Sequence, residues 1–318
     1  MSLRVSMVGR QADDTVVRAL RERLPDSVVL EIDGATGAEI LIHGTPTETD
    51  LDSAGLKAVI IPYAGVPGPT RARLAARPHI ALHNLHHNAA PTAEMAVALL
   101  LAAAKRIVPL DAALRKGDWS PRYDEPSEML LDGAHLIVLG FGQIGARVAA
   151  AAVALGMRVT AVRTRPRGDE PVTTIAADRL DEALPTADAL VLTLPLTEAT
   201  EGLLDARRLA QLKDGCCIVN VGRGPLIDEE ALHTELASGR LRAGLDVWYR
   251  YPENKDAAAS TAPSRFEFGA LENVVLSPHR AGHCMRIEEL RADHLARMLS
   301  AAARDEPMPN RVNVEMGY

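Results

Sequence analysis

The chain has 318 residues, which favours two domains, because a single hydrophobic core rarely grows beyond about 250–300 residues. Lys and Arg together number 35 and Asp and Glu 42, and the net charge of −7 argues against nucleic acid or an anionic membrane as the main partner. The three cysteines show neither a disulfide framework nor a metal-ligand spacing, and no apolar run approaches the about 20 residues of a membrane span. We therefore expect a soluble cytoplasmic protein without a bound metal.

The N-terminal part of the chain alternates short apolar runs with amphipathic or polar segments. Residues 3–9 predict a strand, and the stretch from Asp13 to Leu24 predicts a helix that Pro25 ends. Gly, Pro and Asp stand between the runs that follow, which indicates turns. The pattern predicts a small parallel α/β unit. Its further strands are expected at 28–32, 39–43, 58–63 and 79–84.

The pattern changes at Pro91, where a mostly apolar helix is predicted over 91–107, buried on nearly all sides. A polar, Pro-rich loop over 116–128 separates it from a second α/β series, whose near-continuous apolar runs are typical of strands covered on both faces. An amphipathic helix is predicted over 283–303, and an extended tail follows. The strands of the second series are expected at 135–140, 158–163, 189–195, 216–222, 242–248 and 273–278.

The segment "GFGQIG" carries the strongest local signal, because an apolar strand runs into it and an Ala-rich helix follows at once. Gly140 permits the tight turn, Gly142 lets the backbone approach a pyrophosphate, and Gly145 lets helix and strand pack closely. The helix N-terminus offers N–H donors and partial positive charge to the phosphates. The alternative is a tight glycine turn without a ligand. The predicted cofactor contacts here are Gly140, Gly142, Gln143, Ile144 and Gly145.

The next strand should end beside the cofactor ribose, where NAD sites usually place Asp or Glu. Here the strand runs into Arg163, Thr164 and Arg165, and the first acid is Asp169. Guanidinium groups suit a 2′-phosphate by charge and by fork geometry, so we predict NADP(H) in preference to NAD(H). The alternative is a solvated basic loop, which would leave NAD(H) as the cofactor.

Four more motifs accompany the glycine turn. They are "LTLPLTEAT" (192–200), "VNVGRGPLID" (219–228), "GLDV" (244–247) and "SPHRAG" (277–282). In this order, and over nearly the whole chain, they resemble the D-isomer-specific 2-hydroxyacid dehydrogenase family. The resemblance implies two Rossmann-like, doubly wound parallel-sheet domains of α/β class. The smaller, substrate-binding domain would be discontinuous, with residues 1–91 and 283–318, and the dinucleotide-binding domain would span 92–282.

The resemblance also implies roles for matching residues. Arg223 would bind the substrate carboxylate and polarise the 2-oxo group, and His279 would be the general acid/base. Asp246 would lie beside the nicotinamide carboxamide. The alternatives are a surface turn arginine, a loop histidine and a capping acid. The backbone donors for the substrate carboxylate would be Ala64 and Gly65, and the cofactor groove would be lined by Leu194, Pro195, Val221, Gly222 and Gly282.

The chain departs from the family where a Glu usually pairs with the catalytic histidine. Tyr251 stands at that position, just before Pro252, and we expect it in the substrate pocket. A hydroxyl stabilises an imidazolium less than a carboxylate does, so His279 should lose its proton at a lower pH than in Glu-bearing relatives. Glu253 is an alternative partner. Pro67, where many relatives carry Asp, makes an unusual substrate preference an expectation.

The resemblance thus implies an enzyme that transfers a hydride between NAD(P)H and a small 2-oxo acid or D-2-hydroxy acid. Homodimer contacts would come from the helix at 91–107 and its loop. The alternative is a non-enzymatic, dinucleotide-responsive regulatory protein on the same fold. The histidines of "HNLHH" (83–87) suggest a metal site, but no suitable carboxylate or cysteine accompanies them, and solvated or hydrogen-bonded histidines are the preferred interpretation.

Overall fold

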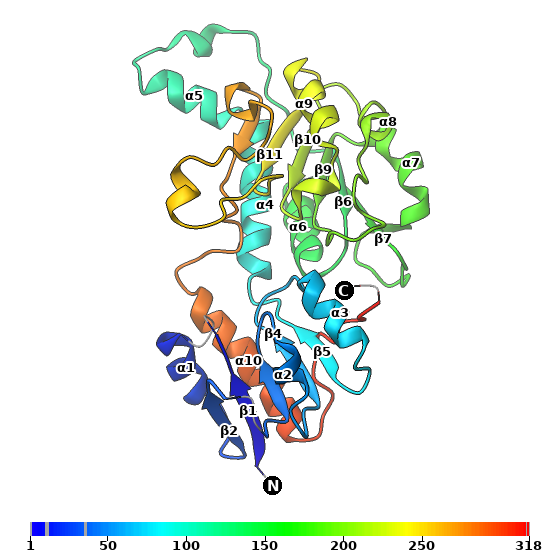
Figure 1. Cartoon of the computed structure of the whole chain (residues 1–318). Coiled ribbons are helices and arrows are strands. Elements are labelled where there is room, and N and C mark those ends of the chain that lie inside the picture. The colour runs from blue at the N-terminus through cyan, green and yellow to red at the C-terminus, as the bar shows by residue number, and fades with distance from the viewer. Residues whose placement is uncertain (1, 10–12, 35–36, 316, 318) are drawn as a thin grey trace. The chain divides into compact units, whose positions relative to one another are not determined.

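Residues 2–9, 13–34, 37–315 and 317 are described by the computed structural model of the chain (Figure 1). The backbone contacts divide the chain into unit 1, residues 1–89 and 283–318, and unit 2, residues 90–282. Each unit contains one parallel sheet with helices on both faces, which confirms the predicted α/β class with two Rossmann-like sheets. The N-terminal segment of unit 1 ends at residue 89, two residues before the predicted boundary at 91. The binding role of each unit stays a prediction.

Unit 1 contains a five-stranded sheet in the order β2-β1-β3-β4-β5, in which all neighbours run parallel. The order reverses between β1 and β3, as in flavodoxin-like doubly wound folds. All five strands lie at the predicted places, with ends shortened by one or two residues in most cases. They are β1 (Leu3–Met7), β2 (Val28–Ile32), β3 (Ile40–Ile42), β4 (Ala58–Ile61) and β5 (Ala81–Asn84).

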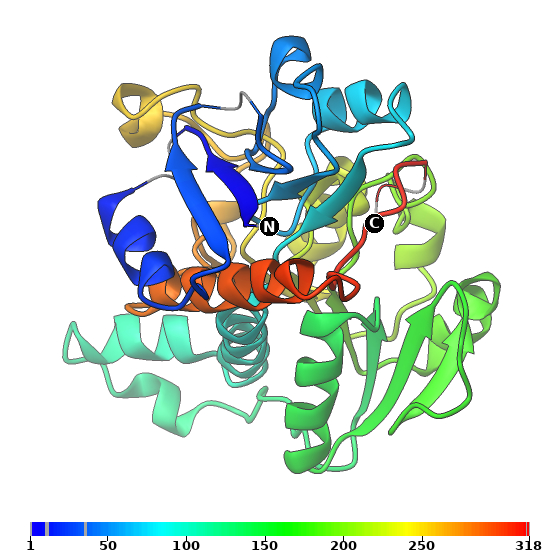
Figure 2. The same ribbon diagram turned by 90° about the horizontal axis from the view of Figure 1, so that it is seen from below.

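Successive side chains of these strands enter two different cores, because a strand alternates its faces. Ile40 and Ile42 pack with helices α1 and α10, whereas Leu41 packs with α2 and α3 on the other face. Helix α10 lies beside α1 although the whole of unit 2 separates them in sequence (Figure 2). The helices are α1 (Asp14–Arg21), α2 (Glu48–Leu51), α3 (Gly68–Ala75) and α10 (Ile287–Ala303).

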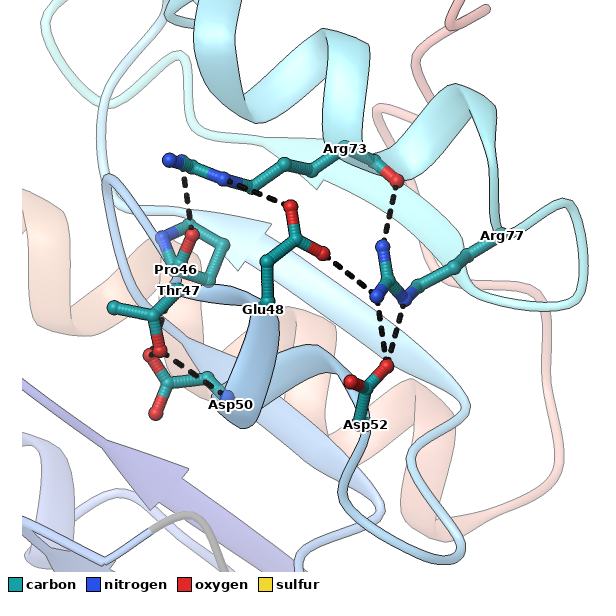
Figure 3. Close-up of polar contacts among 7 residues, drawn as sticks. All are labelled: Pro46, Thr47, Glu48, Asp50, Asp52, Arg73 and Arg77. Atoms are coloured by element: carbon teal, nitrogen blue, oxygen red, sulfur yellow. Dashed lines mark hydrogen bonds and ion pairs between the residues drawn. The ribbon is translucent and has the colours of Figure 1, made fainter.

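A group of charged side chains joins α2 to the end of α3 (Figure 3). The guanidinium of Arg77 lies 2.7 Å from carboxylate oxygens of both Glu48 and Asp52, and it also donates to the carbonyl oxygen of Arg73. Arg73 in turn forms an ion pair with Glu48 at 3.4 Å. The Arg77 side chain is 18% exposed, but the Glu48 and Asp52 side chains are 60% and 65% exposed, so each pair is a surface ion pair of modest strength. These contacts join the two helices that cover this face of the sheet.

Unit 2 contains a seven-stranded parallel sheet in the order β12-β11-β10-β9-β6-β7-β8. The order reverses between β6 and β9, and ligands of such sheets bind outside the carboxyl ends of the strands near that point. The strands are β6 (His135–Leu139), β7 (Arg158–Arg163), β8 (Thr173–Ala176), β9 (Ala189–Leu192), β10 (Cys217–Asn220), β11 (Arg242–Leu245) and β12 (Val274–Leu276).

Both faces of this sheet are covered. Leu136 and Val138 face a core shared with α4 and α6, and Ile137 and Leu139 face one shared with α7, α8 and α9. This explains the near-continuous apolar runs of β6, β9 and β10. The helices are α4 (Ala89–Ala104), α5 (Ile107–Leu114), α6 (Gln143–Ala154), α7 (Leu180–Ala183), α8 (Ala206–Leu209) and α9 (Glu229–Ala237).

Three expectations about elements were wrong. The helix predicted over 91–107 covers Ala89–Ala104, because Arg106 adopts a left-handed backbone (φ 51°) and a separate helix α5 follows it. The burial of α4 on nearly all sides was predicted correctly, since the exposed residues Ala90, Glu94 and Ala98 form a single stripe. Strand β8 went unpredicted, and α10 begins at Ile287 rather than at residue 283. Among the described residues, no helix is long and apolar enough to cross a membrane.

Candidate active site

The glycine turn, residues 140–145, lies between β6 and α6. Gly140 has φ +96°, a conformation that favours glycine. A Cβ atom on Gly145 would lie 1.9 Å from the carbonyl oxygen of Gly140, whereas one on Gly142 would meet nothing within 4 Å. Gly142 is also the N-cap of α6 and supplies no side-chain acceptor to the first turn. This open backbone at an uncapped helix N-terminus fits a dinucleotide pyrophosphate.

Residues after β9 lie against the glycine turn. The Thr193 hydroxyl donates to the Gly140 carbonyl oxygen at 2.8 Å. A Cβ on Gly140 would lie 3.1 Å from a methyl carbon of Leu194, and one on Gly222 would lie 2.7 Å from the carbonyl oxygen of Leu194. Leu194 therefore lies between the two glycine segments, which brings together residues that the sequence predicted to share a groove. Of their predicted neighbours, Pro195 is exposed, Val221 is buried and Gly282 is half-buried.

The ribose loop, residues 163–170, follows β7. The guanidinium of Arg163 lies 3.0 Å from the Glu170 carboxylate, whose side chain is 6% exposed. Thr164 and Arg165 are exposed. Among the described residues, the side chain of Arg165 forms neither a hydrogen bond nor an ion pair. The two predicted phosphate-binding arginines thus have different surroundings, because Glu170 neutralises only one of them.

Arg223 lies on a turn that Asn220 holds in shape. The Asn220 side-chain oxygen accepts from the amide of Gly222 at 3.0 Å, and its nitrogen donates to the carbonyl oxygen of Arg223 at 2.8 Å. Asn220 is 1% exposed and is the last residue of β10. Gly224 packs so closely on Trp248 that a Cβ there would lie 2.3 Å from the Trp248 carbonyl oxygen. The Arg223 side chain itself is exposed, so a buried amide positions a solvent-accessible guanidinium.

Asp246 is 1% exposed and comes directly after β11. Its carboxylate accepts from the Ser277 hydroxyl at 2.5 Å, from the amide of Arg280 at 2.8 Å and from the amide of Ala281 at 3.1 Å. The His279 amide donates to the backbone carbonyl of Asp246 at 2.9 Å. Asp246 caps none of the described helices, because these donors belong to a loop. Asp246 fixes the histidine loop, residues 277–281, and its contact with a nicotinamide carboxamide stays a prediction.

The Tyr251 ring lies beside the imidazole of His279, with 5.3 Å between ring centroids and 56° between the ring planes. His279 is exposed and has a left-handed backbone (φ 55°). The Tyr251 hydroxyl accepts from the amide of Trp248 at 3.0 Å. Burial raises the pKa of Tyr251, against smaller lowering effects of the Trp248 amide and the Arg223 charge. The phenol is therefore protonated at neutral pH and offers no negative charge to the imidazole.

The predicted carboxylate donors lie in unit 1, in the turn after β4. Among the described residues, the amides of Ala64 and Gly65 have no hydrogen-bond acceptor. Asn84, the last residue of β5, donates through its side chain to the Ala64 carbonyl oxygen at 2.6 Å. Their role as donors to a substrate carboxylate stays a prediction. Arg223 and His279 belong to unit 2.

The three histidines of "HNLHH" (83–87) are the side chains for which the sequence raised a metal site. Within the part of the chain that is described, no group of three or more His, Cys, Asp or Glu side chains could hold a metal ion. His83 contacts the Pro309 carbonyl oxygen through Nδ1 at 2.8 Å. Burial, together with Arg291, lowers the pKa of His87 to about 3, so its imidazole is neutral.

Sequence reasoning missed Asn84, Glu170, Thr193 and Asn220. Asn84 and Asn220 had a readable signal, because each is a polar residue at the carboxyl end of a buried strand. Thr193 follows β9 at the same edge of the sheet. Glu170 had none, because its role depends on the path of the loop after β7.

Three comparisons with known proteins agree with this geometry. The family model "D-isomer specific 2-hydroxyacid dehydrogenase, NAD binding domain" matches residues 97–281. The hydroxypyruvate reductase of Thermotoga maritima is 33% identical over 262 residues, which are 81% of this chain and 82% of that protein. The glyoxylate reductase of Korarchaeum cryptofilum is 35% identical over 71% of this chain and 66% of its own length.

One solved structure can be aligned with this chain over the full length of both proteins. It is the D-isomer specific 2-hydroxyacid dehydrogenase of Xanthobacter autotrophicus Py2 in complex with NADPH and MES, with 25% identity and a TM-score of 0.82. Both doubly wound sheets are therefore shared with a protein that binds a nicotinamide dinucleotide. Taken with the match of the family model over more than half of the sequence, this makes the chain a member of the D-isomer-specific 2-hydroxyacid dehydrogenase family.

Proposed function

We propose that this chain is an NADPH-dependent reductase that converts a small 2-oxo acid into its D-2-hydroxy acid. Membership of the family makes it an NAD(P)-dependent oxidoreductase acting on 2-oxo or 2-hydroxy acids. The preference for NADPH and the roles of individual residues are the proposal. The observation that carries it is that Arg223, Asp246 and His279 follow the three neighbouring parallel strands β10, β11 and β12, at the carboxyl edge of the unit 2 sheet.

The arrangement can perform the two halves of a carbonyl reduction. A bound reduced nicotinamide would supply the hydride that the carbonyl carbon accepts. The guanidinium of Arg223 would bind the substrate carboxylate by paired donors and draw electron density toward the 2-oxo oxygen. His279 would give that oxygen a proton, which completes the hydroxyl group. Asp246 would act by holding the loop that presents the imidazole.

The relatives support a small substrate and a phosphorylated cofactor. The Thermotoga protein is named a hydroxypyruvate reductase and the Korarchaeum protein a glyoxylate reductase. The Xanthobacter structure contains NADPH. Arg165, which is exposed and unpaired among the described residues, supports NADPH in this chain.

A regulatory protein without catalysis is the other candidate, and no observation favours it. Such a protein could keep the glycine turn, but it would have no need of Arg223 and His279 on loops ordered by the buried Asn220 and Asp246. The family relatives named above are reductases.

We also propose a cytoplasmic homodimer. Helix α5 buries none of its residues, and large apolar side chains are exposed along it and the loop that follows. A second copy of the chain would cover this surface. The three free cysteines support a reducing compartment. The exposed apolar side chains are Ile107, Val108, Leu114, Trp119, Tyr123 and Leu130.

The decay of nicotinamide absorbance tests the proposal. Purified protein is mixed with NADPH or NADH and with glyoxylate, hydroxypyruvate, pyruvate, phenylpyruvate or 2-oxoglutarate. Turnover of at least one acid is expected, and His279→Ala should lower kcat by about 10²–10⁴-fold. His283→Ala, an exposed histidine just beyond the histidine loop, is the matched control. Cofactor binding without turnover of any acid would count against the reductase and in favour of the regulatory protein.

A further inference from the structure

The ribose loop has an internal carboxylate that organises it. Glu170 accepts hydrogen bonds from the amides of Arg167 and Gly168, both at 2.8 Å, and from the guanidinium of Arg163 at 3.0 Å. Its side chain is 6% exposed. Gly168 has φ +87°, so the loop turns back on itself at that position. Both ends of the loop are thereby bonded to the same carboxylate.

The pKa of Glu170 is lowered, so its carboxyl group is ionised at neutral pH. The amide of Arg167 makes the largest contribution to lowering the pKa of this carboxyl, and the Arg163 guanidinium adds to it. A half-buried Arg163 held by an ionised carboxylate has little positive potential left for a second anion. To bind a phosphate it would have to leave Glu170, which would then be a mostly buried carboxylate without its cation.

Arg165 lies in the same loop, but no carboxylate of the described residues neutralises its charge. It is exposed, and among the residues that the structure describes no acid pairs with it. Its guanidinium keeps its full charge and its donors for a ligand at the end of β7. The three arginines of "VRTRPRG" therefore differ in availability. Glu170 holds Arg163, whereas Arg165 and Arg167 are exposed and form no ion pair among the described residues. Arg165 lies two residues beyond the end of β7 and Arg167 four, which makes Arg165 the nearer of the two.

We propose that Glu170 is the positioning residue of cofactor selection: it withholds Arg163 from the 2′-phosphate and leaves Arg165 to bind it. The inference rests on the proposed preference for NADPH and assigns it to one arginine. It also assigns a specificity role to an acid that touches neither the phosphate nor the reacting atoms.

The test uses fragments of the cofactor, so that it does not depend on turnover. Isothermal titration calorimetry measures the binding of adenosine 2′,5′-bisphosphate and of 5′-AMP to the full chain. Arg165→Ala should weaken the bisphosphate by about tenfold or more, as for one lost charge-assisted contact, and change 5′-AMP by less than about twofold. Arg163→Ala should change the bisphosphate by less than about threefold. Arg158→Ala, at the exposed start of β7, controls for the loss of one positive charge.

Glu170→Gln tests whether Glu170 controls the availability of Arg163 or only supports the fold of the loop. The amide oxygen can accept from only one of the two loop amides, because Arg167 and Gly168 donate to different carboxylate oxygens, and the charge that holds Arg163 is gone. Affinity for the bisphosphate should rise by about threefold or more, and adding Arg163→Ala should remove that gain, as a double-mutant cycle would measure. A purely structural role would instead weaken both fragments together.

Two different failures can be told apart. Equal affinity of the native chain for bisphosphate and 5′-AMP would refute the NADPH preference itself. A clear preference for the bisphosphate that disappears in Arg163→Ala but survives in Arg165→Ala would keep NADPH and overturn the role of Glu170. Denaturant unfolding of each variant identifies any loss that comes from misfolding.

Discussion

The glycine turn and the histidine loop lie at the carboxyl edge of the same sheet, but different interactions hold them in shape. The glycine turn depends on close backbone packing, with the Gly140 carbonyl oxygen filling the space where a side chain on Gly145 would be. The histidine loop depends on the side chain of Asp246, which accepts from three residues more than thirty positions away. Steric change should therefore damage the first region, and loss of one polar side chain should damage the second.

Asp246→Asn should have the largest effect. It removes the negative charge that strengthens the bonds from Ser277, Arg280 and Ala281 to one carboxylate oxygen, and it turns an amide N–H donor toward the backbone amide of Ala281. We expect the free energy of unfolding to fall by about 3 kcal/mol and kcat to fall with it, because His279 loses its support. Urea unfolding and steady-state kinetics measure both. Ser277→Ala removes a single donor and should cost only about 1 kcal/mol. An unchanged kcat in Asp246→Asn would show that the Asp246 side chain does not hold the histidine loop in its active shape.

Gly145→Ala and Gly142→Ala together test whether close backbone packing holds the glycine turn in shape. Alanine at 145 would place Cβ 1.9 Å from a carbonyl oxygen, so about 2 kcal/mol of stability should be lost. Alanine at 142 meets open space and a compatible φ of −93°, so stability should change by less than about 0.5 kcal/mol. Binding of NADPH should nevertheless weaken by about tenfold in Gly142→Ala, because the backbone could no longer approach the pyrophosphate. Equal stability loss in both variants would contradict the packing argument.

Asn220→Ala should have a smaller effect than Asp246→Asn. It removes one acceptor and one donor from the turn that carries Arg223. We expect about 1–2 kcal/mol less stability and a higher KM for the 2-oxo acid, since the guanidinium that binds the carboxylate is no longer fixed. The measurement is KM against kcat. A fall in kcat at constant KM would show that the turn serves a different step.

Substitutions of Tyr251 should have the smallest effect on stability. Tyr251→Phe keeps the ring beside His279 and removes only the acceptor for the Trp248 amide, at a cost of about 1 kcal/mol. Because burial keeps the phenol protonated, the pH dependence of reduction should not change.

Tyr251→Glu should shift the pH dependence instead. A carboxylate raises the pKa of a neighbouring imidazole. Reduction needs the protonated imidazole, so activity should persist to a pH about one unit higher than in the native chain. The pH profile of kcat/KM decides the matter. Identical profiles for the Phe and Glu variants would mean that residue 251 exerts no electrostatic control over His279.

Much of the fold was readable because its signals are local. The bounds of β7 were predicted without error, since an apolar run with clear turn residues marks them. Strand β8 was missed because it is a half-exposed edge strand with two threonines and no apolar run. Helix α5 was missed because it begins where the predicted helix was expected to end, at 107, and only the left-handed backbone of Arg106 separates the two helices.

In the candidate site, too, local features could be predicted and features that depend on tertiary contacts could not. The glycine turn could be predicted because its helix and strand are adjacent in sequence. The supporting roles of Asp246 and Glu170 could not, since they depend on where separate loops meet. Resemblance to a family named the exposed residues Arg223 and His279, but it could not show which buried amides and carboxylates hold them.

Helix α10 has a consequence for biosynthesis. The ribosome releases β1 to β5 long before it makes Ala292, Leu295 and Leu299, which complete the core on one face of their sheet. The nascent N-terminal segment must therefore wait with an apolar sheet face uncovered, while unit 2, which is continuous in sequence, can fold first. We therefore expect unit 2 to complete its core before unit 1 does, in contrast to the usual N-terminal-first order of co-translational folding.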